Sequence, residues 1–124
     1  MFLRTTGLSG RYAWCAAFAS HVFVEADVKA PVSAWSPDWF RSNVVYSKNR
    51  ITIEDFRSQP GQVIGLYYEG LGRIGHVGLI VGEDRLHYRT IEGNTGPDGG
   101  RDGDGVYKKI RRKKGIYKIA DYVE

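Results

Sequence analysis

The sequence predicts an α+β domain in which N-terminal helices pack on an antiparallel β-sheet of about five strands. An alanine-rich apolar stretch without Gly or Pro comes first and is typical of a helix. After Pro60 the chain turns to successive runs rich in β-branched and aromatic residues, which are typical of strands. The connections between these runs are short, apart from one Gly-rich segment, so neighbouring strands are expected to pair antiparallel.

The first helix is expected over residues 12–26. Residues on one of its faces recur at helical spacing: Cys15, Phe18, Ala19, Val22 and Ala26. Phe23 lies on the opposite face, so we expect the helix to be buried on most sides.

Two shorter helices are expected before the strands begin. One covers residues 34–40, with Ser36 as the N-cap and Pro37 at the first helical position. The other is a turn of helix over residues 52–57, which ends before Pro60.

The strands are expected over residues 62–69, 74–81, 85–92, 106–112 and 116–123. Residues 93–105 hold six of the 16 glycines, so we expect a loop or a long hairpin turn there.

The bulk properties fit one soluble globular domain over residues 1–124, with 42% hydrophobic and 26% charged residues. No apolar run approaches the ~18 residues that a membrane helix needs, so no transmembrane segment is expected. The first ten residues do not resemble a signal peptide. The protein therefore works in the cytoplasm, leaves the cell by another route, or is one domain of a longer product.

The single cysteine excludes an internal disulfide and CxxC zinc ligation. The stretch DGDG at 102–105 resembles part of a calcium loop, but Lys113 stands where an EF-hand needs Glu. No metal or cofactor is expected. The net charge of +4 is compatible with anionic partners such as cell-wall polymers.

Cys15 lies near the start of the first expected helix, where the helix dipole favours a thiolate. It is either a small buried packing residue or a nucleophile, and a nucleophile needs a histidine. His21 points to another side of the same helix, and a solvated strand face accounts for His87. His76 is different because it stands between Gly75 and Gly78 on an apolar strand, where a polar ring needs a partner.

Glu92 and Asn94 are candidates for the group that orients His76. They stand two residues apart, so both side chains can face one side of a strand. If the two strands form a hairpin that turns around residues 82–84, His76 falls roughly opposite Glu92. Taken together, Cys15, His76 and Glu92 indicate a thiol-dependent hydrolase.

Three segments of the chain resemble one family. YAWCAAFAS (12–20) resembles the nucleophile segment of CHAP domains, which are cysteine- and histidine-dependent amidohydrolases or peptidases of the papain-like group. IGHVGLIVG (74–82) is similar to their histidine strand and TIEGNTG (90–96) to their Glu/Asn strand. PGQVI (60–64) resembles the strand that precedes the histidine.

The resemblance implies a papain-like core and the hydrolysis of an amide bond in bacterial peptidoglycan. The bond is either within the peptides, as for an endopeptidase, or between N-acetylmuramic acid and L-alanine, as for an amidase. It implies that Cys15 is the nucleophile, His76 the general base and acid, and Glu92 the orienting group. Asn94 then orients His76 or contacts substrate. Trp14 and Tyr12 are candidate substrate-binding residues.

The chain departs from the family pattern at several positions. Ala13 and Gln62 replace the usual Pro and Asp, and residues 1–14 hold no acidic residue, so the calcium site of some relatives is not carried over. The oxyanion donors are expected to be the backbone N–H groups of Cys15 and Ala16. NlpC/P60 peptidases, a related family, usually have a third His instead of Glu-x-Asn. The Glu92-Gly93-Asn94 segment therefore favours the CHAP family over NlpC/P60.

Two other functions remain open. The alternative is a catalytically inactive module of the same fold that binds cell wall through its positive charge. Nucleic-acid binding through KKIRRKK (108–114) is the weaker possibility, because alternation along this segment is typical of a solvated edge strand. We therefore expect no nucleic-acid partner.

Overall fold

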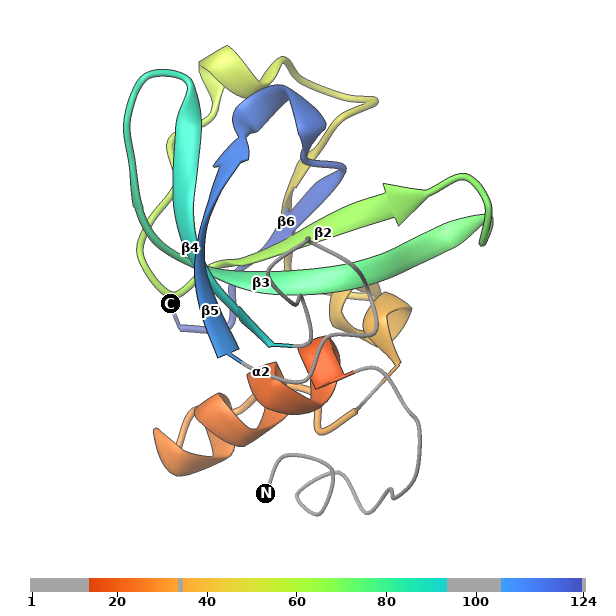
Figure 1. The fold of residues 1–124 in the computed structure, drawn as a ribbon, viewed down its shortest axis with the longest axis vertical. Helices are drawn as coiled ribbons and strands as arrows, with labels where there is room; N and C mark the ends of the chain where they lie inside the picture. The colour runs from red at the N-terminus through yellow and green to blue at the C-terminus, as the bar shows by residue number, and fades with distance from the viewer. Residues whose placement is uncertain (1–13, 34, 94–105, 124) are drawn as a thin grey trace.

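The computed structural model describes residues 14–33, 35–93 and 106–123. Within these ranges the chain forms one α-helix and a six-stranded sheet (Figure 1). The helical elements are α2 (Trp14–Glu25) and the short 3-10 helices η1 (Ser36–Phe40), η2 (Ile53–Asp55) and η3 (Lys113–Gly115). The strands are β1 (Val44–Ser47), β2 (Val63–Tyr68), β3 (Arg73–Glu83), β4 (His87–Gly93), β5 (Val106–Arg112) and β6 (Lys118–Ala120).

All strand pairs in the sheet are antiparallel, and the strand order is β1-β6-β2-β3-β4-β5. Strands β2 to β5 follow one another as a meander, and β6 returns to lie between β2 and β1. The expected α+β class with an antiparallel sheet is confirmed. The sheet has one strand more than expected, because β1 was missed.

Strand β1 is short, and its first two residues are exposed. Four residues carry too little alternation to be recognised as a strand, so its place depends on pairing with β6. The last expected strand, over 116–123, is shorter in the structure, since only Lys118–Ala120 is paired as β6. The other four expected strands are present with bounds that differ by up to two residues.

The two short helices expected before the strands are 3-10 helices. Ser36 was expected to be the N-cap of the first, which is wrong, because Trp35 occupies that position and makes no side-chain cap hydrogen bond. Ser36 is instead buried inside η1, and Ser33 Oγ donates to Asp38 Oδ2 at 2.6 Å. Five residues allow little more than one turn, so packing determines this segment more than capping does.

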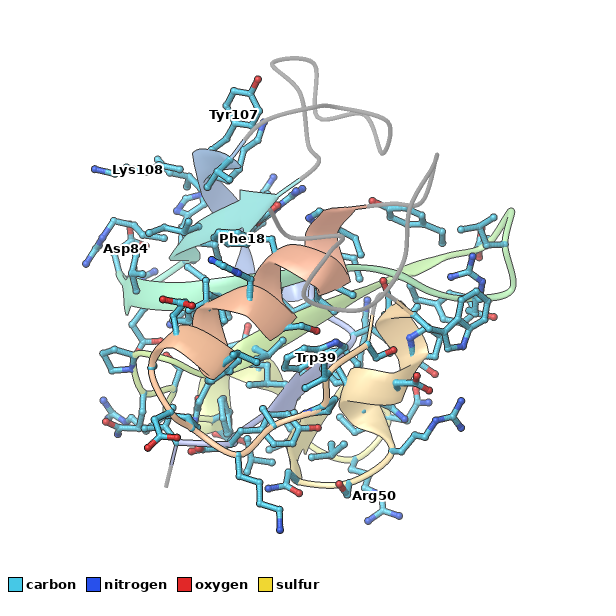
Figure 2. The ribbon with its side chains drawn as sticks, turned by 90° about the horizontal axis from the view of Figure 1, so that it is seen from below. Phe18, Trp39, Arg50, Asp84, Tyr107 and Lys108 are labelled. Carbon is cyan, nitrogen blue, oxygen red and sulfur yellow. The ribbon has the colours of Figure 1, made fainter. Side chains whose placement is uncertain are left out.

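Helix α2 packs on one face of the sheet and forms a first hydrophobic cluster with it and with η1 (Figure 2). Phe18 and Phe23 of α2 meet Trp39 and Val77 in this cluster. Ser20 is fully buried on the helix, and its hydroxyl accepts from the backbone N–H of Ser33 at 2.9 Å. This bond fixes α2 to the segment that leads into η1.

The opposite face of the sheet carries a second hydrophobic cluster. Its buried members come from five strands, from η2 and from the segment before β6: Tyr46, Ile53, Ile64, Ile80, Tyr88, Ile116 and Ile119. Because both faces are covered, seven consecutive residues of β3, 74–80, are buried. Polar side chains in the middle of β3 therefore need protein partners.

Neither α2 nor any other helix in the described ranges has the length and apolarity to cross a lipid bilayer.

Candidate active site

His76 and Glu92 form a buried polar pair in the middle of the sheet. Their side chains are 1% and 0% exposed, and His76 Nε2 lies 2.7 Å from Glu92 Oε1. His76 is on β3 and Glu92 near the end of β4, so the β3–β4 hairpin brings them together. The hairpin expected from the sequence is present, with its turn at residues 84–86 between the two strands.

Gly78 provides the space for this contact. In the register of β3 with β4, Leu79 pairs with Ile91 and Ile80 with Thr90. If this register is continued by one residue, Gly78 lies opposite Glu92. A Cβ atom on Gly78 would lie 2.7 Å from Glu92 Cγ. The Glu92 side chain therefore crosses over Gly78 and reaches His76, which lies two residues further along β3, so the contact is diagonal rather than directly across.

Glu92 accepts hydrogen bonds from three side chains on three strands. Besides His76, Thr90 Oγ1 donates to Glu92 Oε2 at 2.6 Å. Arg111 of β5 donates through Nε to Oε2 at 2.8 Å and through its second nitrogen, Nη2, to Oε1. The guanidinium of Arg111 thus binds both carboxylate oxygens of Glu92 in a bidentate arrangement.

Glu92 is ionised despite its burial. Burial by itself raises the pKa of a carboxyl, but hydrogen bonds from Arg111, His76 and Thr90 outweigh it and lower the pKa of Glu92 to about 2. An ionised carboxylate can only accept hydrogen bonds, so His76 Nε2 carries a hydrogen and donates it to Oε1. In the neutral ring, Nδ1 is then the nitrogen that can take up a proton.

His76 and Glu92 lie on the face of the sheet opposite to α2. Val77 and Leu79, which alternate with His76 along β3, belong to the cluster beneath the helix. Ile80 and Tyr88, which share the face of His76 and Glu92, belong to the second cluster. The pair is therefore separated from the middle of α2 by the sheet itself.

Cys15 is the second residue of α2, and its side chain lies outside the described part of the structure. The helix begins beside the end of β4 (Figure 1). Phe18, three residues after Cys15, packs so closely on Gly93 that a Cβ there would lie 2.7 Å from Phe18 Cβ. Strand β4 ends at Gly93, which lies opposite Val77 of β3 when the register of the two strands is continued. His76, the residue before Val77, therefore lies just beyond the end of β4. The start of α2 and His76 thus flank the same end of β4.

Of the other site residues expected from the sequence, Tyr12 and Asn94 lie outside the described residues. Trp14 begins α2, but its side chain is not described. Two further aromatic residues, Trp39 and Tyr88, are fully buried core residues and do not line a cleft.

Trp35, by contrast, is 47% exposed. The guanidinium of Arg73 stacks over the Trp35 ring, 4.0 Å from its centroid.

The other two histidines lie away from the buried pair. His21 is half-buried on α2. His87 stands at the start of β4, where its Nδ1 lies 3.4 Å from Oδ1 of the exposed Asp84. Neither one contacts Glu92.

Sequence reasoning missed two partners of Glu92, Thr90 and Arg111. The alternation along residues 106–112 places Arg111 on the same side as Tyr107 and Lys109, and the structure shows that side half-buried. What the sequence lacked was the register of β4 with β5, which pairs Tyr88 with Arg111 across the Gly-rich segment. The sequence did contain one signal for this ion pair, because Glu92 precedes the Gly-rich segment and the basic run 108–114 follows it.

Among the described residues, no group of three or more His, Cys, Asp and Glu side chains could hold a metal ion. No family model matches this chain, and no curated protein matches it.

Proposed function

We propose that the protein is a cysteine amidase or endopeptidase of bacterial peptidoglycan, of the CHAP type that its sequence resembles. The observation that carries the proposal is the buried His76–Glu92 pair, with 2.7 Å between Nε2 and Oε1. A buried imidazole held by an ionised carboxylate is the base of many thiol and serine hydrolases. Cys15, the only cysteine, stands at the start of helix α2. This helix begins beside the end of β4 that carries Glu92.

The reaction follows from these groups. His76 Nδ1 accepts the proton of the Cys15 thiol, and the thiolate attacks the amide carbonyl carbon to form a C–S bond. The imidazolium then protonates the leaving nitrogen as the C–N bond breaks. Water attacks the thioester, a C–O bond replaces the C–S bond, and the thiol regains its proton. Glu92 stabilises the imidazolium of His76 each time it forms.

The start of α2 supports this chemistry in two ways. The positive end of the helix dipole stabilises a thiolate at Cys15. The backbone N–H groups of Cys15 and Ala16 belong to the first turn of the helix, where they have no intrahelical acceptor, so they are available to bind the oxyanion. Because α2 packs on the opposite face from His76, the proposed reaction requires the thiol and the imidazole to meet around the end of β4, near Gly93.

The proposed substrate class rests on the resemblance of WCAAF, GHVG and EGN to the CHAP motifs and on the positive charge of the protein. Lys108 and Arg112 of β5 and Arg89 of β4 are exposed cations on two paired strands. Such a surface attracts the anionic polymers of a bacterial wall.

The test is digestion of purified sacculi of several wall chemotypes. Released amino groups and reducing termini are measured for the wild type, Cys15→Ala, His76→Gln and the matched control His87→Gln. We expect release by the wild type and by His87→Gln, and loss of release in the other two variants. Mass spectrometry of the fragments then identifies the bond cleaved. Equal release by the wild type and Cys15→Ala would contradict the proposal.

The second candidate is a wall-binding module without turnover, which the exposed cations Arg89, Lys108 and Arg112 favour. It predicts that sacculi retain the Cys15→Ala variant as well as the wild type and that retention weakens as salt is added. Retention without released amino groups in any chemotype would favour this module over the enzyme.

A further inference from the structure

The carboxylate of Glu92 is held by more than its histidine. Arg111 reaches it from β5, where its backbone pairs with Tyr88, four residues before Glu92 on β4. The arginine side chain therefore extends along the sheet and places two donors on the two oxygens of Glu92. Its side chain is 24% exposed, whereas Glu92 is fully buried.

We propose that Arg111 is a positioning residue of this site, which fixes the plane of the Glu92 carboxylate and neutralises its charge so that His76 can act as a base. The reaction it would serve is the proposed hydrolysis, so its catalytic meaning rests on that proposal. Its effect on His76 is a property of the folded protein and can be measured without substrate.

Arg111 and Thr90 together fix the orientation of the Glu92 carboxylate. Two parallel N–H···O bonds from a planar guanidinium fix both oxygens, and Thr90 Oγ1 adds a third donor to Oε2. With Oε2 held by Thr90 and Arg111, Oε1 is directed at His76 Nε2. A lysine at position 111 would keep the charge but would supply a point donor instead of a fork.

Arg111 also balances the charge of the Glu92 carboxylate. A buried carboxylate next to an imidazole favours the imidazolium, which cannot accept a proton from a thiol. The guanidinium of Arg111 makes the Arg111–Glu92 unit neutral overall, so the carboxylate orients the ring with a weaker preference for the protonated form.

A purely structural role for Arg111 makes a different prediction. If the ion pair only fastens β5 to β4, its removal lowers the stability of the fold and leaves the titration of His76 unchanged. The two roles are therefore separated by the protonation midpoint of His76.

The experiment is an NMR titration of the imidazole nitrogens in protein labelled with nitrogen-15 at histidine. In Arg111→Met, we expect the midpoint of His76 to rise by on the order of one pH unit relative to wild type, because the carboxylate loses its compensating cation. His21 and His87 serve as internal controls, and their midpoints should not move.

The double variant Glu92→Gln/Arg111→Met removes both charges. We expect its His76 midpoint to return toward the wild-type value, while Glu92→Gln alone lowers the midpoint because the cation is then uncompensated. A pattern of this kind cannot come from general loss of packing. A folded Arg111→Met protein whose His76 midpoint is unchanged or lower would overturn the proposal.

Arg111→Lys is a second variant in case the methionine protein does not give a dispersed spectrum. The lysine keeps the charge without the fork, and we expect a smaller rise of the His76 midpoint, with loss of the fixed Nε2–H signal pattern. An unchanged midpoint and tautomer in Arg111→Lys would also contradict the positioning role. Because no turnover enters these measurements, failure of the proposed hydrolase function would leave the effect of Arg111 on His76 intact.

Discussion

His76 is a polar residue in a run of seven buried residues, and its neighbours make that position tolerable. The ring has Glu92 as an ionised partner, so its polar edge is not left in an apolar core. Glu92 in turn has donors on both oxygens. A buried charge with this many partners is costly to disturb, because removal of one partner leaves the others desolvated and unpaired.

Acid should destabilise the protein through Glu92. Its pKa is about 2 in the folded state against an ordinary value of 4.5, so the folded state binds fewer protons than the unfolded state. The stability that Glu92 contributes is fully present above about pH 4.5 and is lost as the pH falls toward about 2. The shift corresponds to about 3 kcal/mol.

Urea unfolding of the wild type and Glu92→Gln between about pH 5 and pH 2 checks this expectation. The wild type should lose about 3 kcal/mol more than the variant over this range. Asp38 and Asp84 also have lowered pKa values, caused mainly by hydrogen bonds from Ser33 and from the backbone of Leu86. Both are present in the two proteins, so their contributions cancel in the difference. Parallel pH profiles would contradict the expectation.

At the scale of elements, the β3–β4 hairpin is built around the absence of a side chain at Gly78. The two strands are in register at Leu79 and Ile91, and Glu92 lies across the glycine. The end of β4 is similarly fitted to α2, because Gly93 allows Phe18 to approach its backbone. Two glycines, one on each face of the hairpin, thus fix the distances among the elements that carry the candidate site.

Gly78→Ala should therefore disturb the hairpin. The new methyl group would lie 2.7 Å from Glu92 Cγ, so the Glu92 side chain has to move and its bonds to His76 and Arg111 weaken. We expect a loss of about 1–3 kcal/mol in the free energy of unfolding, measured by urea denaturation.

Gly115→Ala is the matched control for this substitution. A Cβ on Gly115 would meet no atom within 4 Å, and its backbone is not left-handed. Its stability should stay within about 0.5 kcal/mol of the wild type. Equal stability of the two alanine variants would show that Glu92 adjusts without cost.

At the scale of the whole molecule, one sheet separates two hydrophobic clusters. The first lies between the sheet and α2, and the second lies on the face that carries His76 and Glu92. The closing strand β6 lies between β1 and β2 and contributes Ala120 to the first cluster and Ile119 to the second. Strand β6 therefore joins β1 to the rest of the sheet and places a buried residue on each face.

Two isoleucines test how stability is distributed. Ile119 is fully buried on the internal strand β6, whereas Ile110 is 71% exposed on the edge strand β5. We expect Ile119→Ala to lower the free energy of unfolding by about 2–5 kcal/mol, because it removes buried methyl groups and leaves a cavity.

Ile110→Ala removes the same atoms from the surface and should change the free energy of unfolding by no more than about 0.5 kcal/mol. Both variants are compared by chemical denaturation under the same conditions. A similar cost at the two positions would mean that β5 is covered in solution by something outside the described residues.

Local patterns in the sequence were enough to predict the class of the fold, the places of four strands and the helix, and the pairing of His76 with Glu92. These follow from local patterns, since periodicity and turn residues act over a few positions and a short hairpin fixes its own register. Cys15 as the third member stays a prediction from the sequence.

The other features depend on the tertiary structure. Three features depend on pairings between residues far apart in the chain: strand β1, the place of β6 beside β2, and the hydrogen bonds of Arg111 to Glu92. The tertiary structure also decided that His76 faces away from α2, because a bulge at Gly75 and the packing of both clusters determine which face each residue takes. No local pattern encodes such pairings, since they are chosen by the burial of the whole sheet.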